Sequence, residues 1–374
     1  MHQLVASPQD GKFVMVRPGA RGGIQLPFAF YRELGTAVAE RSPVPEWLVG
    51  AARQAWGLEL EHRSSEQVVL VRSQTPLNYS RATWEINRGC NFACDHCVVW
   101  KRPFEGLSPA DKGRLLELLR GAGVLWLQFT GGEPTIDPDF PVAYRQAYGI
   151  GMMLEILTNG TRLAHKPTLD LLSTLPPHKI TVSLYGATAD SFDALTRKRG
   201  AFNRVMKGLA AAREARLPLD LSLIITRHNA HEAAAMRRLA EQYATRYKEF
   251  ANISPTYDGE LGPLAAQAPE YVDRAGVFTG CPAGHTFFHV DPFGWATMCK
   301  VGRENPVDLM TEGLDGLLRL PAIADAQMLR SGGCNGCRLS ETCRVCRPLA
   351  KLYQDAKAPL HTYCQHGFED GETA

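Results

Sequence analysis

The stretch NRGCNFACDHCVVW, residues 87–100, places three cysteines within eight positions, at Cys90, Cys94 and Cys97. A structural zinc ion or an iron–sulfur cluster usually takes four protein ligands, and this loop supplies three cysteines. One interpretation is a zinc site with His96 as the fourth ligand, although aiming both His96 and Cys97 at one ion would strain the loop. The other interpretation is a 4Fe–4S cluster whose fourth iron is left open for chemistry.

The composition describes a globular protein long enough for two or three domains. Of its 374 residues, 45% are hydrophobic, and 41 basic against 39 acidic residues give a net charge of +2. This balance argues against a dedicated nucleic-acid binder, and no apolar run approaches the length of a membrane span. The N-terminus MHQLVASPQDGK also lacks the layout of a signal peptide. We therefore expect a cytoplasmic protein with neither nucleic-acid nor membrane partners, whose ten cysteines are ligands rather than disulfides.

The middle of the chain alternates strand-like and helix-like segments, which predicts parallel β/α units. The first strand is TWEINRG, and the segment SPADKGRLLELLRGAG predicts a helix capped by Ser108. A second helix is expected over 231–248. Five further strands are expected at 124–130, 152–158, 179–185, 219–226 and 250–257. These units predict an α/β fold, a partial (β/α)6 barrel, with its chemistry at the C-terminal ends of the strands.

Residues outside the barrel form three further parts. Residues 1–80 combine strands such as KFVMVRP and QVVLVRS with two short amphipathic helices, which predicts a small winged-helix-like module. The barrel is expected over 81–257. Residues 258–364 read as loop-rich and cysteine-rich, with metals in place of a large core, and residues 365–374 as a tail.

A second motif, Thr130-Gly131-Gly132-Glu133-Pro134, ends the second strand. Its glycines allow a ligand to approach the backbone, and Glu133 is able to receive an ammonium group. Together with the three-cysteine loop, this turn resembles the radical S-adenosylmethionine (SAM) enzymes over residues 81–257. The resemblance implies that SAM completes the open iron, and that an electron from the cluster cleaves SAM to give a 5′-deoxyadenosyl radical. It also implies SAM contacts at Gly131, Gly132, Glu133, Asn159 and Ser183.

One residue of the loop departs from that resemblance. Family members often place an aromatic residue before the third cysteine, where this chain has His96. The departure concerns stacking on adenine and not the cluster itself.

The remaining cysteines resemble the SPASM extension of peptide-modifying radical SAM enzymes. They are Cys281, Cys299, Cys334, Cys337, Cys343, Cys346 and Cys364, with Gly294 preceding Cys299. A zinc ribbon is the alternative for any pair of C-x2-C units. The resemblance implies two auxiliary 4Fe–4S clusters, hence three in all, one held by Cys334, Cys337, Cys343 and Cys364, the other by Cys281, Cys299 and Cys346.

The second of these sets is one ligand short. Some relatives carry a further cysteine where this chain has Ala275, so its fourth iron is left for His285, a backbone or water oxygen, or a substrate thiol. The last C-x2-C spacing is also one residue shorter than the usual SPASM pattern, which bears on how the cysteines divide between the clusters.

The resemblance implies a radical SAM peptide maturase, an oxidoreductase of the biosynthesis of ribosomally made, modified peptides (RiPPs). It would abstract a hydrogen from a precursor peptide and form an intrapeptide thioether, carbon–carbon or ether crosslink. A flavodoxin or ferredoxin would donate electrons, and the N-terminal module would bind a leader peptide by strand addition, with KFVMV as the receiving strand. No catalytic residue beyond the cluster ligands is assigned.

Three alternatives stay open at this point. Two are enzymes: a sulfatase-maturase-type dehydrogenase acting on a Cys or Ser side chain, and a radical SAM oxidase of a small molecule. The third is a non-catalytic iron–sulfur or zinc regulator, which would leave the Gly-Gly-Glu-Pro turn unexplained.

Overall fold

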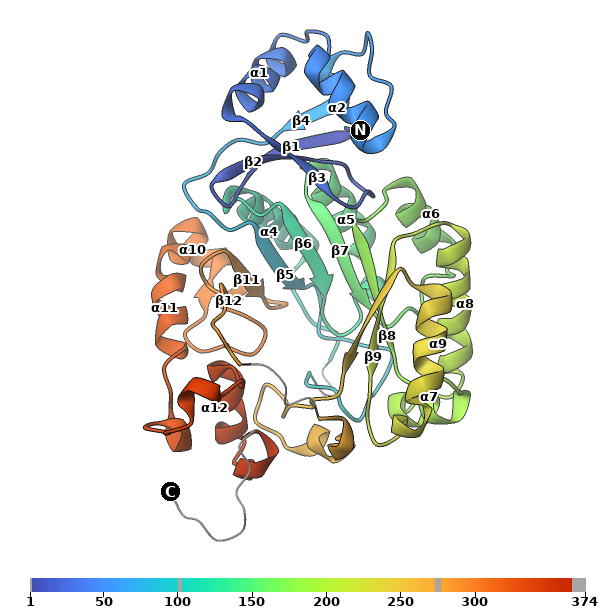
Figure 1. Ribbon diagram of the computed structural model, residues 1–374, viewed down its shortest axis with the longest axis vertical. Coiled ribbons are helices and arrows are strands. Elements are labelled where there is room, and N and C mark those ends of the chain that lie inside the picture. Colours follow the sequence, from blue (N-terminus) through green and yellow to red (C-terminus); the bar gives the residue numbers. More distant parts are fainter. Residues whose placement is uncertain (1, 100–102, 273–276, 365–374) are drawn as a thin grey trace.

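The centre of the protein is one long β-sheet, seen in a computed structural model that describes residues 2–99, 103–272 and 277–364 (Figure 1). Its strand order is β10-β9-β8-β7-β6-β5-β11-β12-β13. Six strands are parallel and follow each other along the chain. They are β5 (Arg81–Glu85), β6 (Trp126–Thr130), β7 (Met153–Thr158), β8 (Lys179–Leu184), β9 (Leu219–Ile224) and β10 (Arg246–Phe250). The predicted α/β class is confirmed, and the sheet curves as a barrel that is not closed.

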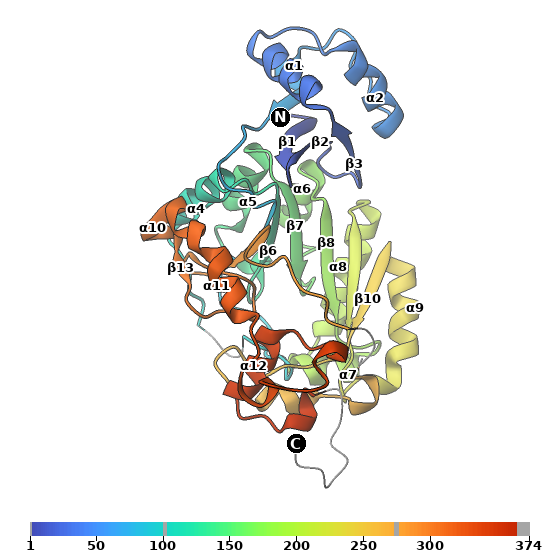
Figure 2. The same cartoon turned by 60° about the vertical axis from the view of Figure 1, so that its left-hand side comes forward.

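Helices cover the outer face of this sheet (Figures 1 and 2). They are α4 (Pro109–Gly121), α5 (Phe140–Gly149), α6 (Lys166–Thr174), α7 (Ala189–Thr196), α8 (Ala201–Glu214) and α9 (Ala233–Tyr243). The hydroxyl of Ser108 accepts a hydrogen bond from the amide of Asp111 and caps α4 as predicted. Apolar strand residues such as Trp84, Phe129 and Ile156 are fully buried in the core shared with the helices. The opposite face of the strands faces the lumen of the open barrel and combines polar residues such as Glu155 and Thr181 with apolar ones such as Leu157.

The end of the barrel corrects two predictions. The last strand is Arg246–Phe250 rather than 250–257, and residues 251–256 form no strand. The helix predicted over 231–248 is shorter, at Ala233–Tyr243, because the residues from Arg246 onward pair with β9. As an edge strand with a polar inner face, RYKEF lacks the apolar run by which the other strands are recognised.

The N-terminal module has its own four-stranded sheet, in the order β3-β2-β1-β4. Its elements are β1 (Leu4–Gln9), β2 (Lys12–Val16), β3 (Gly23–Leu26), α1 (Phe28–Ala39), α2 (Glu46–Trp56), α3 (Ser65–Val68) and β4 (Val69–Val71). The segment KFVMV is β2, which pairs with both β1 and β3. It is therefore a central strand and not the free edge that strand addition requires, which corrects the prediction for this segment.

This module packs against the N-terminal ends of the barrel strands (Figure 1). Val5 and Val16 from its sheet form one buried cluster with Leu125 and Met153 at the start of β6 and β7. The loop after β2 adds an ion pair of 2.6 Å between Arg21 and Asp220 of β9. The module thus covers the end of the barrel opposite to the rim where the cysteine loop lies.

The C-terminal region extends the barrel sheet instead of forming a separate one. Strand β11 (Phe287–Val290) pairs in parallel with β5, and β12 (Trp295–Thr297) and β13 (Val307–Asp308) follow it. This region also contains helices α10 (Leu309–Gly316), α11 (Leu320–Gln327) and α12 (Arg347–Asp355), so it is more regular than the sequence predicts. Ala275 and residues 365–374 lie outside the described part. Within that part, no helix is both long and apolar enough to cross a membrane.

A buried ion pair ties α4 to the turn after β6 and gives a first prediction. The Nζ atom of Lys112 lies 2.8 Å from Asp137 Oδ1, and both side chains are almost completely buried. Lys112→Met leaves the Asp137 carboxylate buried without its cation, so we expect the free energy of unfolding to fall by about 3–5 kcal/mol. The exposed pair Lys166–Asp170 supplies the control, since Lys166→Met is expected to cost less than about 1 kcal/mol. Urea denaturation measures both, and equal losses would contradict the prediction.

Candidate functional site

The three-cysteine loop follows β5 and is held in place by backbone contacts. The amides of Ala93 and Asp95 donate to the carbonyls of Thr196 and Leu195 at the end of α7. Cys94 is buried and Cys97 half-buried, whereas Cys90 is the most exposed of the three. Burial raises the pKa of the Cys94 thiol well above its ordinary value, so a bound metal would be needed to keep it as a thiolate.

A cavity of about 250 Å³ lies beside this loop, at the C-terminal ends of the strands. It gathers most of the residues that the sequence assigned to the cluster and to SAM, namely Cys90, Cys94, Cys97, Gly131, Gly132, Asn159 and Ser183. Glu85, Thr130, Tyr185, Tyr257 and Lys300 also line it. Residues far apart in the sequence therefore meet at the rim where β/α proteins place their chemistry.

The Gly-Gly turn touches the base of the cysteine loop backbone to backbone. The amide of Gly132 donates to the carbonyl of Asn87 at 3.1 Å, and the amide of Glu133 to that of Gly89 at 2.9 Å. A Cβ atom at Gly132 would lie 2.1 Å from the Gly89 carbonyl oxygen, and Gly131 has a φ of +135°. Glycine is needed here because a larger residue would push the turn and the loop apart.

Glu133 occupies a different place from the one that the sequence predicts. Its side chain is fully buried and accepts hydrogen bonds from the Thr158 hydroxyl at 2.6 Å and the Asn159 amide at 2.6 Å. Thr135 donates its amide to the same carboxylate at 3.0 Å. Burial raises the pKa of Glu133, and these donors counteract the shift. Glu133 does not line the cavity, so its position does not support an ammonium contact; it joins the turn after β6 to the turn after β7.

Asn159 connects this framework to the cysteine loop. Its Nδ2 atom donates to Asn91 Oδ1 at 2.7 Å, and Asn91 in turn donates to Thr161. His96 lies on the other side of the cavity, where its ring centroid is 5.2 Å from that of Tyr185. The Nδ1 atom of His96 is buried and has no hydrogen-bond partner among the described residues. The rings of His96 and Tyr185 therefore form an aromatic part of the cavity wall.

A buried polar network at the same rim was missed from the sequence. Glu85 at the end of β5 lies 2.8 Å from an Arg303 nitrogen and 3.4 Å from His289 Nε2. Lys300 donates to the Thr130 hydroxyl at 2.9 Å. These residues come together because β11 pairs beside β5, with His289 opposite Thr83. The single available signal was that Lys300 directly follows a predicted cluster ligand, Cys299.

The C-terminal cysteines fall into two neighbourhoods. The charges of Cys299 and Cys281 add to burial in raising the pKa of Cys346. The charges of Cys343, Cys364 and Cys337 act in the same way on Cys334. The assignment of these cysteines to two separate clusters stays a prediction. His285, a predicted candidate for a fourth ligand, pairs with Asp325 at 2.8 Å.

The arrangement of ligand side chains also bears on zinc. In the part of the chain that the structure describes, no three His, Cys, Asp or Glu side chains are arranged to hold one metal ion.

This architecture is similar to that of known proteins. Residues 84–240 match the model of the radical SAM superfamily. Most of the barrel is therefore similar to a radical SAM domain. Among curated proteins, the mycofactocin maturase MftC of Mycobacterium ulcerans is 32% identical over 241 residues, which cover 59% of this chain and 63% of that protein. The PqqA peptide cyclase of Xanthomonas euvesicatoria is 28% identical over 178 residues, 47% of each chain. The chain thus matches less than two thirds of these relatives.

Solved structures extend the similarity of fold beyond the radical SAM domain. Streptococcus suis SuiB bound to the precursor peptide SuiA superimposes with a TM-score of 0.59 at 16% identity. The alignment covers 91% of this chain and 93% of SuiB. The N-terminal module and the cysteine-rich C-terminal region therefore share in the common architecture.

Contact between the Gly-Gly turn and the cysteine loop gives a second prediction. In Gly132→Ala the new methyl group meets the Gly89 and Arg88 backbone, so the loop is displaced and its cysteines are misaligned. We expect the iron bound per chain after anaerobic reconstitution to fall by about four, the content of one cluster. Gly149→Ala is the control, because its methyl group would have no neighbour within 4 Å. Unchanged iron in Gly132→Ala would show that the contact does not position the loop.

A third prediction concerns His289, which is fully buried. Burial lowers its pKa to about 4, below the ordinary value near 6.5. Between these values the unfolded chain binds a proton that the folded protein does not, so the free energy of unfolding falls as the pH drops from about 6.5 to 4. The loss from this group is about 3 kcal/mol. Urea denaturation across this range should show a shallower pH dependence for His289→Gln, and an identical slope would contradict the assignment.

Proposed function

We propose that the protein is a radical SAM peptide maturase that removes a hydrogen from a residue of a precursor peptide and forms an intrapeptide crosslink. The crosslink would be a thioether, a carbon–carbon or an ether bond. The observation that carries the proposal is the cavity at the barrel rim, where Cys90, Cys94 and Cys97 meet Gly131 and Gly132. A regulator would not need an open site of this kind beside a cluster loop.

The residues around the cavity fit the expected cofactors. Three thiols supply one ligand fewer than a 4Fe–4S cluster needs, which leaves one iron for SAM. We assign Gly131, Gly132, Asn159 and Ser183 to contacts with SAM, and His96 lines the same cavity. When bound, the cluster and SAM supply reductive cleavage of the sulfonium and, with it, a hydrogen-abstracting carbon radical.

Residues of the chain itself position this centre and line the cavity around it. Glu133 fixes the turns after β6 and β7 against each other, so it is a positioning residue rather than a ligand-binding one. Tyr185 and Tyr257 line the cavity, and burial raises the pKa of both hydroxyls, which keeps them neutral. Lys300 places a cation at the same wall, where it is able to orient an anionic group of the substrate or of SAM.

We further propose two auxiliary 4Fe–4S clusters, held by the two cysteine neighbourhoods of the C-terminal region. Mutual electrostatic effects within each set support this division. In this proposal the set with Cys281, Cys299 and Cys346 keeps one open iron, which a substrate thiolate would occupy. A flavodoxin or ferredoxin would supply electrons.

The N-terminal module is the part of the chain that we assign to recognition of the peptide. Residues 1–80 would recognise a leader segment by strand addition, for which the sheet order leaves β3 and β4 as edges. Relatives named as a maturase and as a peptide cyclase, and a fold shared with SuiB bound to its precursor peptide, support a peptide substrate.

Iron content tests the cofactor assignment. We expect about twelve irons per chain after anaerobic reconstitution and about eight in the triple variant Cys90→Ala, Cys94→Ala, Cys97→Ala, because only the cluster of the loop is lost. The variant should also fail to cleave SAM under reduction with dithionite. About four irons in the wild type, with zinc making up the remainder, would overturn the auxiliary clusters. Wild-type protein with full iron but no SAM cleavage would overturn the proposed function.

A further inference from the structure

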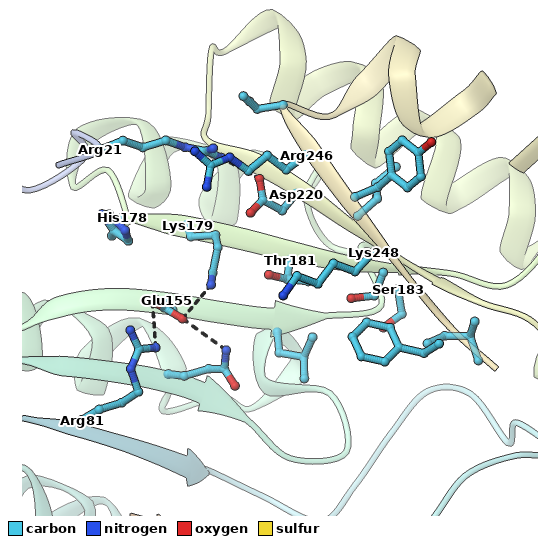
Figure 3. Close-up of a pocket in the computed structure, with 18 of the residues that line it drawn as sticks. Arg21, Arg81, Glu155, His178, Lys179, Thr181, Ser183, Asp220, Arg246 and Lys248 are labelled. Atoms are coloured by element: carbon cyan, nitrogen blue, oxygen red, sulfur yellow. Dashed lines mark hydrogen bonds and ion pairs between the residues drawn. The ribbon is translucent and has the colours of Figure 1, made fainter. Parts of the chain in front are cut away.

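A second and larger cavity fills the lumen of the open barrel. Its volume is about 1060 Å³, and Figure 3 shows side chains from β7, β8, β9 and β10 around it. Leu157 and Ser183 line both this cavity and the one beside the cysteine loop. At its other end are Arg21 and Gly22 of the N-terminal module. The lumen therefore extends from the module to the proposed reaction centre.

Positive charge dominates the wall of this lumen. Five cationic side chains line it, Arg21, Arg81, Lys179, Arg246 and Lys248, against two carboxylates, Glu155 and Asp220. Both carboxylates are already engaged by three of the cations. Asp220 pairs with Arg21 at 2.6 Å, while Glu155 pairs with Arg81 at 3.0 Å and with Lys179 at 3.1 Å.

Arg246 and Lys248 are the two cations left over. Neither side chain has an ion-pair or hydrogen-bond partner among the residues that the structure describes, and both are exposed. The register places Arg246 beside Asp220, but Arg21 occupies that carboxylate. In Figure 3, Lys248 extends from β10 over the inner face of the sheet toward Thr181. An anion in the lumen would meet two cations without having to displace an existing partner.

The strand that carries these cations is also an edge. Strand β10 pairs with β9 on one side and ends the sheet on the other, so its outer backbone amides and carbonyls are open to another strand. Arg246 and Lys248 are two residues apart and hence point to the same face. An extended peptide added to β10 would place its own residues i and i+2 opposite them.

We propose that this lumen is the docking channel for an acidic, extended segment of the peptide substrate, which pairs with β10 and sets carboxylates against Arg246 and Lys248. The inference rests on the proposed function, because it assumes a peptide that must reach the cysteine-loop cavity. A peptide is favoured over other anions since it alone satisfies both the free strand edge and the paired cations. A segment bound here would bridge the N-terminal module and the reaction centre.

Fluorescence anisotropy with the full chain, reconstituted anaerobically, tests the proposal. The probe is a fluorescein-labelled ten-residue peptide alternating Glu with Val and Thr, and its match alternates Lys in place of Glu. We expect the acidic peptide to bind at least tenfold more tightly than the basic one. The charge reversal Arg246→Glu with Lys248→Glu should weaken its binding at least tenfold, and a neutral pair, Arg246→Gln with Lys248→Gln, should give an intermediate loss.

The matched control reverses two exposed cations on the outer helices, Lys207→Glu on α8 and Arg238→Glu on α9. It makes the same change in net charge, so its affinity should change less than twofold. Hydrogen exchange should also show protection of the β10 amides when the acidic peptide binds. Unchanged affinity in both lumen variants would overturn the proposal, as would equally tight binding of a ten-nucleotide oligo-dT, which would indicate a general anion site.

The peptide-binding test and the SAM-cleavage test can fail independently of each other. Peptide binding needs no turnover, whereas the proposed function is judged by SAM cleavage under dithionite without peptide. Binding by a wild-type protein that cleaves no SAM would preserve the docking channel and reject the maturase. If the wild-type protein cleaves SAM but the lumen variants bind the peptide normally, the proposed function stands and the docking channel is rejected.

Discussion

The structure depends on the two-fold alternation of the barrel strands. Successive side chains of a strand point to opposite faces, and here the outer face is apolar while the inner face carries the charged residues of the strands. Trp84, Phe129 and Ile156 pack under the outer helices, while Glu85, Gln128 and Glu155 face inward. A parallel sheet with an apolar inner face would pack its lumen with side chains. This one keeps its lumen as a cavity, which is the space that a substrate needs.

A polar lumen has an energetic requirement, because buried charges must be paired or hydrogen-bonded. Near the module end, Glu155 meets Arg81 and Lys179. At the rim, Glu85 meets Arg303. The charges that are left unpaired lie on β10, where the edge of the sheet gives them access to water. Pairing of the other charges thus leaves the two cations Arg246 and Lys248 at the open edge of the barrel.

The rim is held by backbone contacts that tolerate little change. The Gly-Gly turn meets the cysteine loop without side chains between them, and Glu133 connects that turn to Asn159. Asn159 then reaches Asn91 inside the loop. Three segments separated by up to about 70 residues are thereby fixed relative to one another, as a preorganised cofactor site requires.

The sequence by itself determined the fold class, the cysteine loop and the turn that accompanies it. Spacing of cysteines and the placing of turns after strands are local properties, and local chemistry is what a sequence displays directly. It placed β10 wrongly, because an edge strand with a polar face lacks the apolar run of its neighbours. Only the tertiary structure decided that Glu133 is a buried connector, that KFVMV is a central strand, and that Glu85, His289, Arg303 and Lys300 form one network. These facts depend on which strands pair and on which charges are already engaged, and pairing between distant segments follows from packing that no single stretch of sequence encodes.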